Sequence, residues 1–483
     1  MKLFFISLFI FQLPLSLFAA SKNSTDKETY KKKEIKRKIS SLERSLNTEK
    51  ILNFKTSKDV YTFLLELKNK KDQNIMNNYE TRTLKALSFP LLHLRGLYWR
   101  FNKLITRVKI FDNSIDSFLH KYYSNFDIRP SHIPPLWQYM TSPIPSSNQF
   151  KTVSEAQSFT LKTIIPSIDE AIKRLKMIEN ENIDNKNEDL SLLNLDLALI
   201  YGEKRTKNLI NKKSRFLNIY ISDLILLKSW FQDLQGSLLY LSSYNLDGLH
   251  KMINVFRGHI VLGNAKKFFS RLRLSKNRLT NYEALSEAKL FMLKKLLTRK
   301  RYKNLFRIKN TNYNGSHTLI KSKEFFLNAV QSKMKAIKIS NKNILNNDLN
   351  RSRRLGIESG NDFFNLSLKH LQLKRKLLKG PLVVHDRLFT EKVKVNLNAL
   401  FNPNNSAIRD LKNLLPRPRH FQKGLHHFKK NRPLKSQTGL PFLNLGGLLP
   451  EINDFKDLKR KKFLLIQRAG VGFPLGLWLT VLI

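Results

Sequence analysis

The segment from Phe216 to Leu241 constrains the fold more than any other part of the sequence. It is very apolar and long enough for several helical turns, yet it carries charges at Asp223, Lys228 and Asp233. Charged side chains are costly inside a bilayer, so these residues argue against a membrane span. We therefore expect a buried core helix that forms the central element of the largest domain.

Helical periodicity recurs along most of the chain, which predicts a mainly α fold with a multi-helix, bundle-like core. Thr56 is the expected N-cap of one helix, whose apolar face would comprise Val60, Phe63, Leu64 and Leu67. The helices expected near 281–303 and 366–379 are amphipathic and basic. The other helices are expected over residues 28–50, 79–106, 154–180, 188–211 and 322–337.

A few short strands are expected in an extended, basic C-terminal region. Val393 and Val395 alternate with Lys392 and Lys394 within residues 381–401, which is the period-two pattern of a strand. The apolar end of the chain, over 463–483, is the second place where strands are expected.

Composition divides the chain into five parts. Five prolines lie close together between residues 128 and 150, which indicates an extended linker. The expected parts are an export segment over 1–20, an N-terminal helical region over 21–127, this linker over 128–150, a central helical domain over 151–380, and a basic, irregular region with an apolar tail over 381–483.

The first 20 residues have the pattern of a secretory signal peptide. Lys2 precedes an uncharged apolar stretch that ends in small residues around Ala20. An uncleaved signal anchor is the alternative, since the lysines directly after the stretch are unfavourable for export. At the other end, Lys459 to Ile483 joins a basic cluster to an apolar tail. It is a candidate for contact with a membrane surface, although burial of the tail is the favoured interpretation.

The charge balance indicates an anionic partner. The chain has 87 Lys and Arg against 37 Asp and Glu, which gives a net charge of +50. An AT-rich genome would raise the lysine content, but it does not readily explain the scarcity of acids. Such a chain suits a polyanion: nucleic acid, anionic lipid or acidic glycan. Acids gather over 153–203, where we expect internal pairing with basic helices, whereas 289–323 and 411–450 contain none.

The candidate polyanion-binding residues are therefore clustered cations of the C-terminal half, because phosphate affinity comes from groups of cations that release counterions. Arginine adds bidentate contacts. Nearby aromatic residues such as Tyr302 and Phe306 would be able to stack on unpaired bases, but burial in the core is favoured for them. The candidates are Lys294, Lys295, Arg299, Lys300, Arg301, Arg351, Arg353, Arg354, Lys374, Arg375, Lys376, Arg417, Arg419, Lys429 and Lys430.

Enzymatic chemistry has little support in the sequence. The chain has no cysteine, which excludes disulfides, iron–sulfur ligation and Cys-based zinc sites. The segment from Gly258 to Gly263 lacks the Lys and hydroxyl residues that follow in a phosphate-binding loop. His420, His426 and His427 have cationic neighbours and no carboxylate nearby in the sequence, which favours an anion-facing patch over a metal site. We expect neither a cofactor nor a metal.

Two functions fit these features, and they belong to different compartments. The first is an exported, non-enzymatic helical protein of the periplasm, cell envelope or extracellular space, which binds an anionic surface or polymer through its basic C-terminal half. The second is a structural RNA-binding protein of an organellar or divergent ribosome. An enzyme whose site is assembled from distant residues is the third hypothesis.

The N-terminus of the native protein separates the first two functions. Export with cleavage predicts a chain that begins near Ser21, which intact-mass measurement or N-terminal sequencing would detect. A chain that begins at Met1 and cosediments with ribosomes would contradict export and support the ribosomal role.

Overall fold

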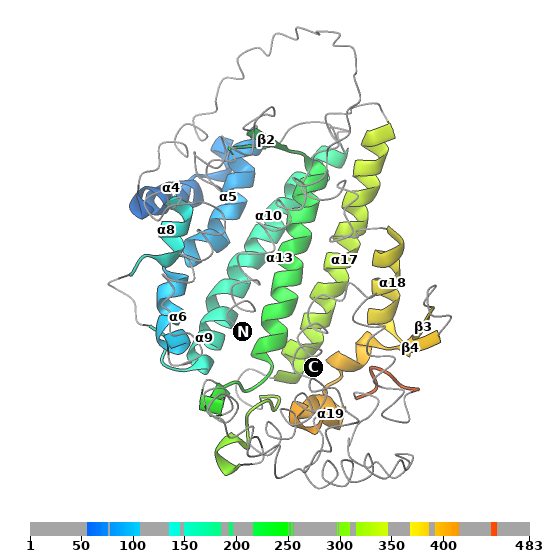
Figure 1. Cartoon of the computed structure of the whole chain (residues 1–483). Helices are drawn as coiled ribbons and strands as arrows, with labels where there is room; N and C mark the ends of the chain where they lie inside the picture. Colours follow the sequence, from blue (N-terminus) through cyan, green and yellow to red (C-terminus); the bar gives the residue numbers. More distant parts are fainter. Residues whose placement is uncertain are drawn as a thin grey trace, which may run out of the picture.

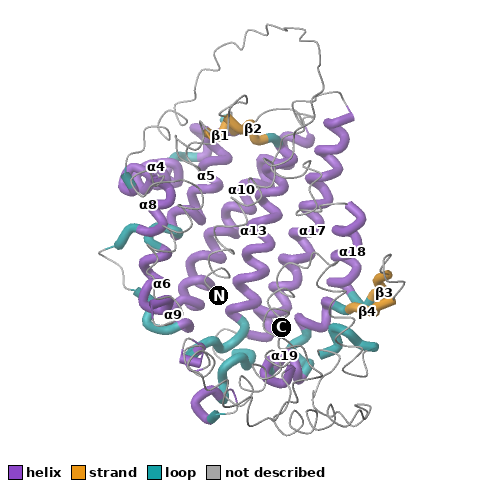
Figure 2. Tube along the Cα trace, viewed as in Figure 1, coloured by secondary structure: helices purple, strands orange, loops and turns teal. Residues whose placement is uncertain are grey.

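Helices make up most of the residues that the computed structural model describes (Figure 1, Figure 2). The predicted mainly α, multi-helix fold is confirmed. The structure describes residues 56–75, 78–106, 135–144, 149–184, 193–196, 216–249, 251–252, 255, 297, 299–309, 315–345, 368–385, 392–414 and 446–451.

Helix α13 (Ile221–Ser242) lies at the centre, with α10 (Ile165–Asp184) on one side and α17 (Gly315–Leu345) on the other (Figure 1). Most of its side chains are buried, and Leu224 and Ile225 have no exposed surface. The predicted core helix is therefore confirmed. A four-residue strand precedes it where the prediction had helix.

A glycine allows α13 and α17 to approach closely. A Cβ atom at Gly236 would lie 3.1 Å from the ring of Phe326, and the Ser322 hydroxyl donates a hydrogen bond to the Gly236 carbonyl at 2.6 Å. Helix α17 is longer at both ends than the predicted 322–337. The added turns are stabilised because they bury Leu319 and Ile339.

The N-terminal helices lie on the side of α10 away from α13 (Figure 1). A π-helical turn, Thr160–Ile164, joins the last of them to α10. The others are α4 (Ser57–Asn69), the 3-10 turn η2 (Asp72–Ile75), α5 (Tyr79–His93), α6 (Leu97–Thr106), α8 (Pro135–Thr141) and α9 (Val153–Phe159).

The predicted start of α4 is confirmed. The Thr56 hydroxyl accepts a hydrogen bond from the Asp59 N–H at 3.3 Å, and the Asp59 carboxylate accepts one from the Thr56 N–H at 2.8 Å. This reciprocal pair is a capping box. The predicted apolar face is buried, including Val60, Phe63 and Leu67.

The first of the C-terminal elements lie beyond α17, at the other edge of the helix array, and the later ones lie below its lower end in this view (Figure 1). The predicted strand pair near 381–401 is present, and Val393 and Val395 are buried as their alternation required. The elements are α18 (Leu368–Lys379), the antiparallel strands β3 (Leu382–His385) and β4 (Lys392–Val395), the 3-10 turn η8 (Leu397–Phe401), α19 (Ser406–Arg409) and the 3-10 turn η9 (Leu411–Leu414).

The predicted single helix over 79–106 is wrong, because the chain breaks it between α5 and α6. Pro90 is accommodated inside α5, and the break falls at Gly96, which has a φ of +57°. Its N–H donates to the Tyr139 carbonyl at 2.9 Å, and an added Cβ would lie 2.6 Å from the Ile144 side chain. The break therefore follows from a contact with a distant segment.

The helix predicted over 188–211 is also wrong where the structure describes it. Strand β1 (Leu193–Asp196) pairs in antiparallel fashion with β2 (Phe216–Ile219). The local sequence Leu-Asn-Leu-Asp has a period of two, and strand pairing with β2 outweighs its weak helical pattern.

Other expectations fall on residues outside the described ranges. These are the segment over 1–20, the helix over 28–50, most of the helix over 281–303 and the strands over 463–483. The division into domains stays a prediction. Within the described ranges, α13 and α17 contribute to both large hydrophobic clusters, one with α4, α5 and α10, the other with α18, β4 and η8.

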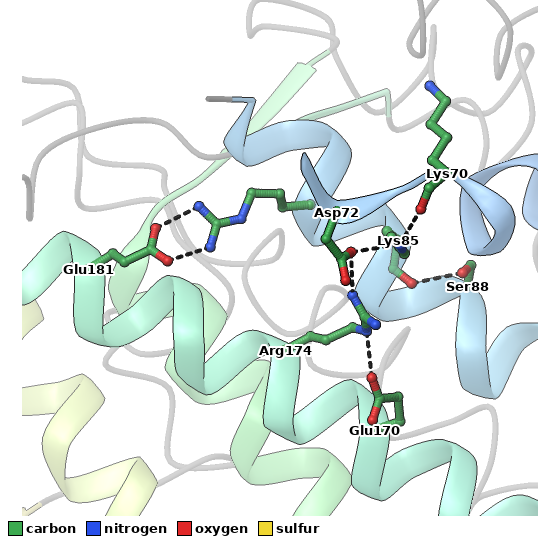
Figure 3. A network of polar contacts seen from close by, with 8 residues as sticks. Lys70, Asp72, Lys85, Ser88, Glu170, Arg174 and Glu181 are labelled. Atoms are coloured by element: carbon green, nitrogen blue, oxygen red, sulfur yellow. Dashed lines mark hydrogen bonds and ion pairs between the residues drawn. The ribbon is translucent and has the colours of Figure 1, made fainter. Parts of the chain in front are cut away.

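The expected internal pairing of the acids is confirmed on the face of α10 that is turned toward α5 (Figure 3). The Arg82 guanidinium donates two hydrogen bonds of 2.6 Å to the Glu181 carboxylate. Asp72 accepts from Lys85 at 2.6 Å and from Arg174 at 2.8 Å. These contacts hold the pKa of the Asp72 carboxyl below its usual value and tie η2 and α5 to α10.

A second set of ion pairs lies within the core. Glu179 of α10 is buried between Lys228 of α13, with which it forms a close ion pair, and Lys335 of α17, whose ammonium is 2.7 Å away. Lys333 of α17 pairs in the same way with Asp233 of α13. The charges of Lys228 and Asp233 on α13 are therefore matched by its two neighbouring helices.

Removing the Glu179 charge will destabilise the fold. Glu179→Gln leaves the buried Lys228 ammonium uncompensated, so we expect the free energy of unfolding to fall by about 3 kcal/mol, measured by urea denaturation. The double variant Glu179→Leu, Lys228→Met should recover most of this loss. Lys335→Met is the control, since that lysine is half-exposed and should cost less than about 1 kcal/mol. An equal loss in the control and in Glu179→Gln would contradict this account.

Candidate polyanion-binding site

A stretch of basic residues, 299–309, lies next to the C-terminal end of α13, and we call it the basic loop. Arg299, Lys300, Arg301 and Lys303 are all exposed. They come from a part of the sequence that contains no acid. The basic loop therefore presents a dense group of cations to solvent.

Apolar side chains of the same loop anchor it to the protein. Tyr302, at the end of the 3-10 turn η5 (Lys300–Tyr302), is buried, as are Leu305 and Ile308. All three belong to the cluster that includes the end of α13 and the start of α17. Their three-residue spacing places them on the inner side and leaves the cations between them on the outer side.

Backbone hydrogen bonds hold the basic loop from two sides. The Phe306 N–H donates to the Asn245 carbonyl at 2.8 Å, and the Asn245 N–H donates to the Arg307 carbonyl at 2.8 Å. On the other side, the Ile308 N–H donates to the Arg409 carbonyl at 3.0 Å. Two segments that are distant in the sequence thus fix the path of the loop.

The conformation of Phe306 shows how firmly this path is imposed. Its φ of +64° is rare for a residue with a side chain. Its carbonyl accepts a hydrogen bond from the Leu411 N–H at 3.2 Å, and its ring packs against the core. Strained backbone of this kind persists only where the surrounding structure determines it.

The nearest carboxylate of the C-terminal elements is used within the fold. Asp410 accepts a hydrogen bond from Arg307 at 2.8 Å and lies 3.5 Å from the Lys412 ammonium. Lys412 is buried and also donates to the Tyr302 and Lys303 carbonyls. Burial lowers the pKa of Lys412, while Asp410 opposes that shift. Asp410 therefore stabilises the base of the loop and leaves its outer cations uncompensated.

No family model, curated protein sequence or solved structure matches this chain. Its function has to be argued from its own residues. Across the described ranges, no group of three or more His, Asp or Glu side chains is arranged to hold a metal ion, and no helix is long and apolar enough to cross a membrane.

The structure brings three predicted site residues together. Arg299, Lys300 and Arg301 lie on the exposed side of the basic loop, as the charge run indicated. Nine of the other candidates lie outside the described residues: Lys294, Lys295, Arg351, Arg353, Arg354, Arg417, Arg419, Lys429 and Lys430.

Of the three candidates on α18, Lys374 and Arg375 are half-buried. Lys376 is exposed. Burial lowers the pKa of Lys374, and the Asp233 carboxylate opposes the shift. The Nε atom of Arg375 is buried and has no hydrogen-bond partner among the described residues. Of this triplet, Lys376 is the one displayed in the same way as the cations of the basic loop.

The structure adds three exposed cations that the candidate set did not include, namely Lys303, Arg307 and Arg409. Lys303 and Arg307 belong to the acid-free stretch over 289–323, so the charge run alone would have found them. Arg409 reaches the loop through the backbone pairing described above, and no local pattern indicates this.

Aromatic side chains of the basic loop belong to the core. Tyr302 is buried, and the Arg301 guanidinium lies 4.7 Å from its ring centre. Phe306 is partly buried against the same core. Stacking on nucleic-acid bases needs accessible rings. These two rings follow the interpretation favoured from the sequence, and the loop offers charge without a stacking platform.

Proposed function

We propose that the chain is an exported helical protein that binds an anionic polymer or surface, and that the basic loop is its principal contact. The observation that supports this most directly is that the exposed cations lie on a loop whose backbone path is fixed by hydrogen bonds. Arg299, Lys300, Arg301 and Lys303 are exposed and form no ion pair with a carboxylate of the described residues. Export rests on the apolar segment over 1–20.

The distribution of acids supports the same proposal. Carboxylates that would otherwise neutralise the surface are held in contacts between elements of the fold. As a result, the excess positive charge of the chain is concentrated on its surface. The acids used in this way include Asp72, Glu179, Glu181, Asp233 and Asp410.

Binding would be driven by charge density. Each Lys or Arg that meets a phosphate, sulfate or carboxylate releases condensed counterions, so affinity falls steeply as salt rises. Arginine adds paired donors that match the geometry of an oxyanion. Because no accessible ring of the loop is placed to stack on a base, we expect little discrimination between sequences of a nucleic acid.

Charge reversal in the basic loop tests this proposal. Arg299→Glu, Lys300→Glu and Arg301→Glu together should weaken binding of labelled heparin or RNA, measured by fluorescence anisotropy. Removing three cationic contacts should reduce the slope of log K against log salt by about 2–3. Salt concentrations between about 50 and 200 mM cover the useful range.

The control variant carries the same change in net charge on exposed lysines of other helices. Lys58→Glu, Lys173→Glu and Lys176→Glu alter α4 and α10 and leave the basic loop intact. This variant should keep most of the wild-type affinity and slope. An equal loss in both variants would show that net charge acts without a defined site, and it would contradict the proposal.

A further inference from the structure

The C-terminal end of α13 is held by a glutamine from a distant part of the chain. Gln157 of α9 is buried, and its side-chain NH2 group donates to the Leu241 carbonyl at 2.8 Å and to the Tyr244 carbonyl at 2.9 Å. The last carbonyls of a helix lack the partners that the helical hydrogen-bond ladder gives to the others. Gln157 therefore supplies donors where α13 ends, and it attaches α9 to this end (Figure 1).

The same side chain contacts the last residue of the basic loop. The Lys309 ammonium donates a hydrogen bond to the Gln157 side-chain oxygen, and the Lys309 N–H donates to the Ser243 carbonyl at 2.9 Å. An amide side chain donates through its nitrogen and accepts through its oxygen. Gln157 uses both atoms, and its hydrogen bonds join α9, the end of α13 and the basic loop at one point.

Lys309 differs in its surroundings from the outer cations of the basic loop. Its side chain is half-buried, whereas Arg301 and Lys303 are exposed. Burial lowers the pKa of Lys309, and the Asp247 carboxylate opposes this shift. A charge that is partly removed from water needs a hydrogen-bond partner within the protein. Gln157 provides such a partner, so the inner end of the loop depends on it.

A second contact attaches α9 to the same junction. Asp247, which follows α13, accepts hydrogen bonds from the Ser154 N–H at 2.9 Å and from the Ser154 hydroxyl. The Asp247 N–H donates to the side-chain oxygen of Asn245 at 2.9 Å. The backbone of Asn245 in turn pairs with the basic loop at Phe306 and Arg307. Both contacts of α9 therefore act on the segment against which the loop is held.

We propose that Gln157 is a positioning residue for polyanion binding: it holds the basic loop in the orientation that displays the outer cations, without contacting the polymer itself. This inference rests on the function proposed above and adds to it an uncharged residue from outside the basic regions. Without Gln157, the Lys309 ammonium loses an acceptor and turns toward water, which loosens the end of the loop. A loosened loop keeps its cations but has to be ordered when it binds, and this ordering lowers affinity.

The variant Gln157→Met tests this role, because methionine is similar in shape but cannot make these hydrogen bonds. Binding of labelled heparin to the full chain, measured by fluorescence anisotropy, should weaken about fivefold. The slope of log K against log salt should keep its wild-type value, since the same number of cations meets the polymer. A reduced slope would show that cationic contacts are lost, and it would contradict a role in ordering the loop.

The matched control is Gln235→Met. Gln235 of α13 is also buried, and its side chain donates to the Asp169 carboxylate at 2.6 Å and to the Ile165 carbonyl at 3.3 Å. The two variants make the same substitution, keep the net charge and lose hydrogen bonds of the same kind, but Gln235 bonds to α10 instead of to the basic loop. Heparin affinity of Gln235→Met should stay at the wild-type level. An equal loss of affinity in both variants would reflect general destabilisation and overturn the proposal.

Hydrogen exchange of the free proteins gives a readout that needs no polyanion. Gln157→Met should speed amide exchange over residues 299–309, where the Ile308 and Lys309 amides are hydrogen-bonded, and Gln235→Met should leave it unchanged. If Gln157→Met does not fold, Lys309→Met removes the other half of the contact and should speed exchange in the same way.

The exchange measurement also separates the two proposals. A wild type that does not bind heparin would contradict the proposed function, and faster loop exchange in Gln157→Met would still identify Gln157 as the residue that holds the loop. Unchanged exchange over 299–309 in a folded Gln157→Met would overturn the inference whether or not heparin binds.

Discussion

A helix that is buried on every side has to be surrounded, and α13 meets this requirement between α10 and α17 (Figure 1). Its interior charges add a condition, because a charge removed from water is tolerated only with a partner. Lys228 forms an ion pair with Glu179 on α10, and Asp233 forms one with Lys333 on α17. These two contacts specify which helices lie beside α13. Gly236 then sets how closely α17 approaches.

The same pairing determines what the surface offers. Carboxylates on α10 and η2 form ion pairs with neighbouring helices, and these pairs connect elements that are far apart in the sequence. Cations without such partners are left outside, as in the basic loop. The basic loop therefore has its origin in a chain with many more bases than acids.

Sequence patterns correctly predicted the elements whose capping or hydrophobic pattern lies within one continuous segment of the chain. The cap at Thr56, the core helix α13 and the basic helix α18 are examples. The sequence patterns failed where a contact with a distant segment decides the local structure. The helix breaks at Gly96, whose N–H donates to the Tyr139 carbonyl, and β1 forms because it pairs with β2. For the site, the acid-free run indicated Arg299 to Arg301. Tertiary packing decides which residues of the basic loop are exposed and which are buried. It also brings Arg409 next to the loop.

Hydrogen exchange of the full chain, with and without heparin, tests the central claim most directly, because it locates the contact without altering any residue. Binding through the basic loop predicts slower amide exchange over residues 299–309 when heparin is bound, with the exposed face of α10 unchanged. Saturating heparin that leaves exchange over 299–309 unaltered would contradict the account.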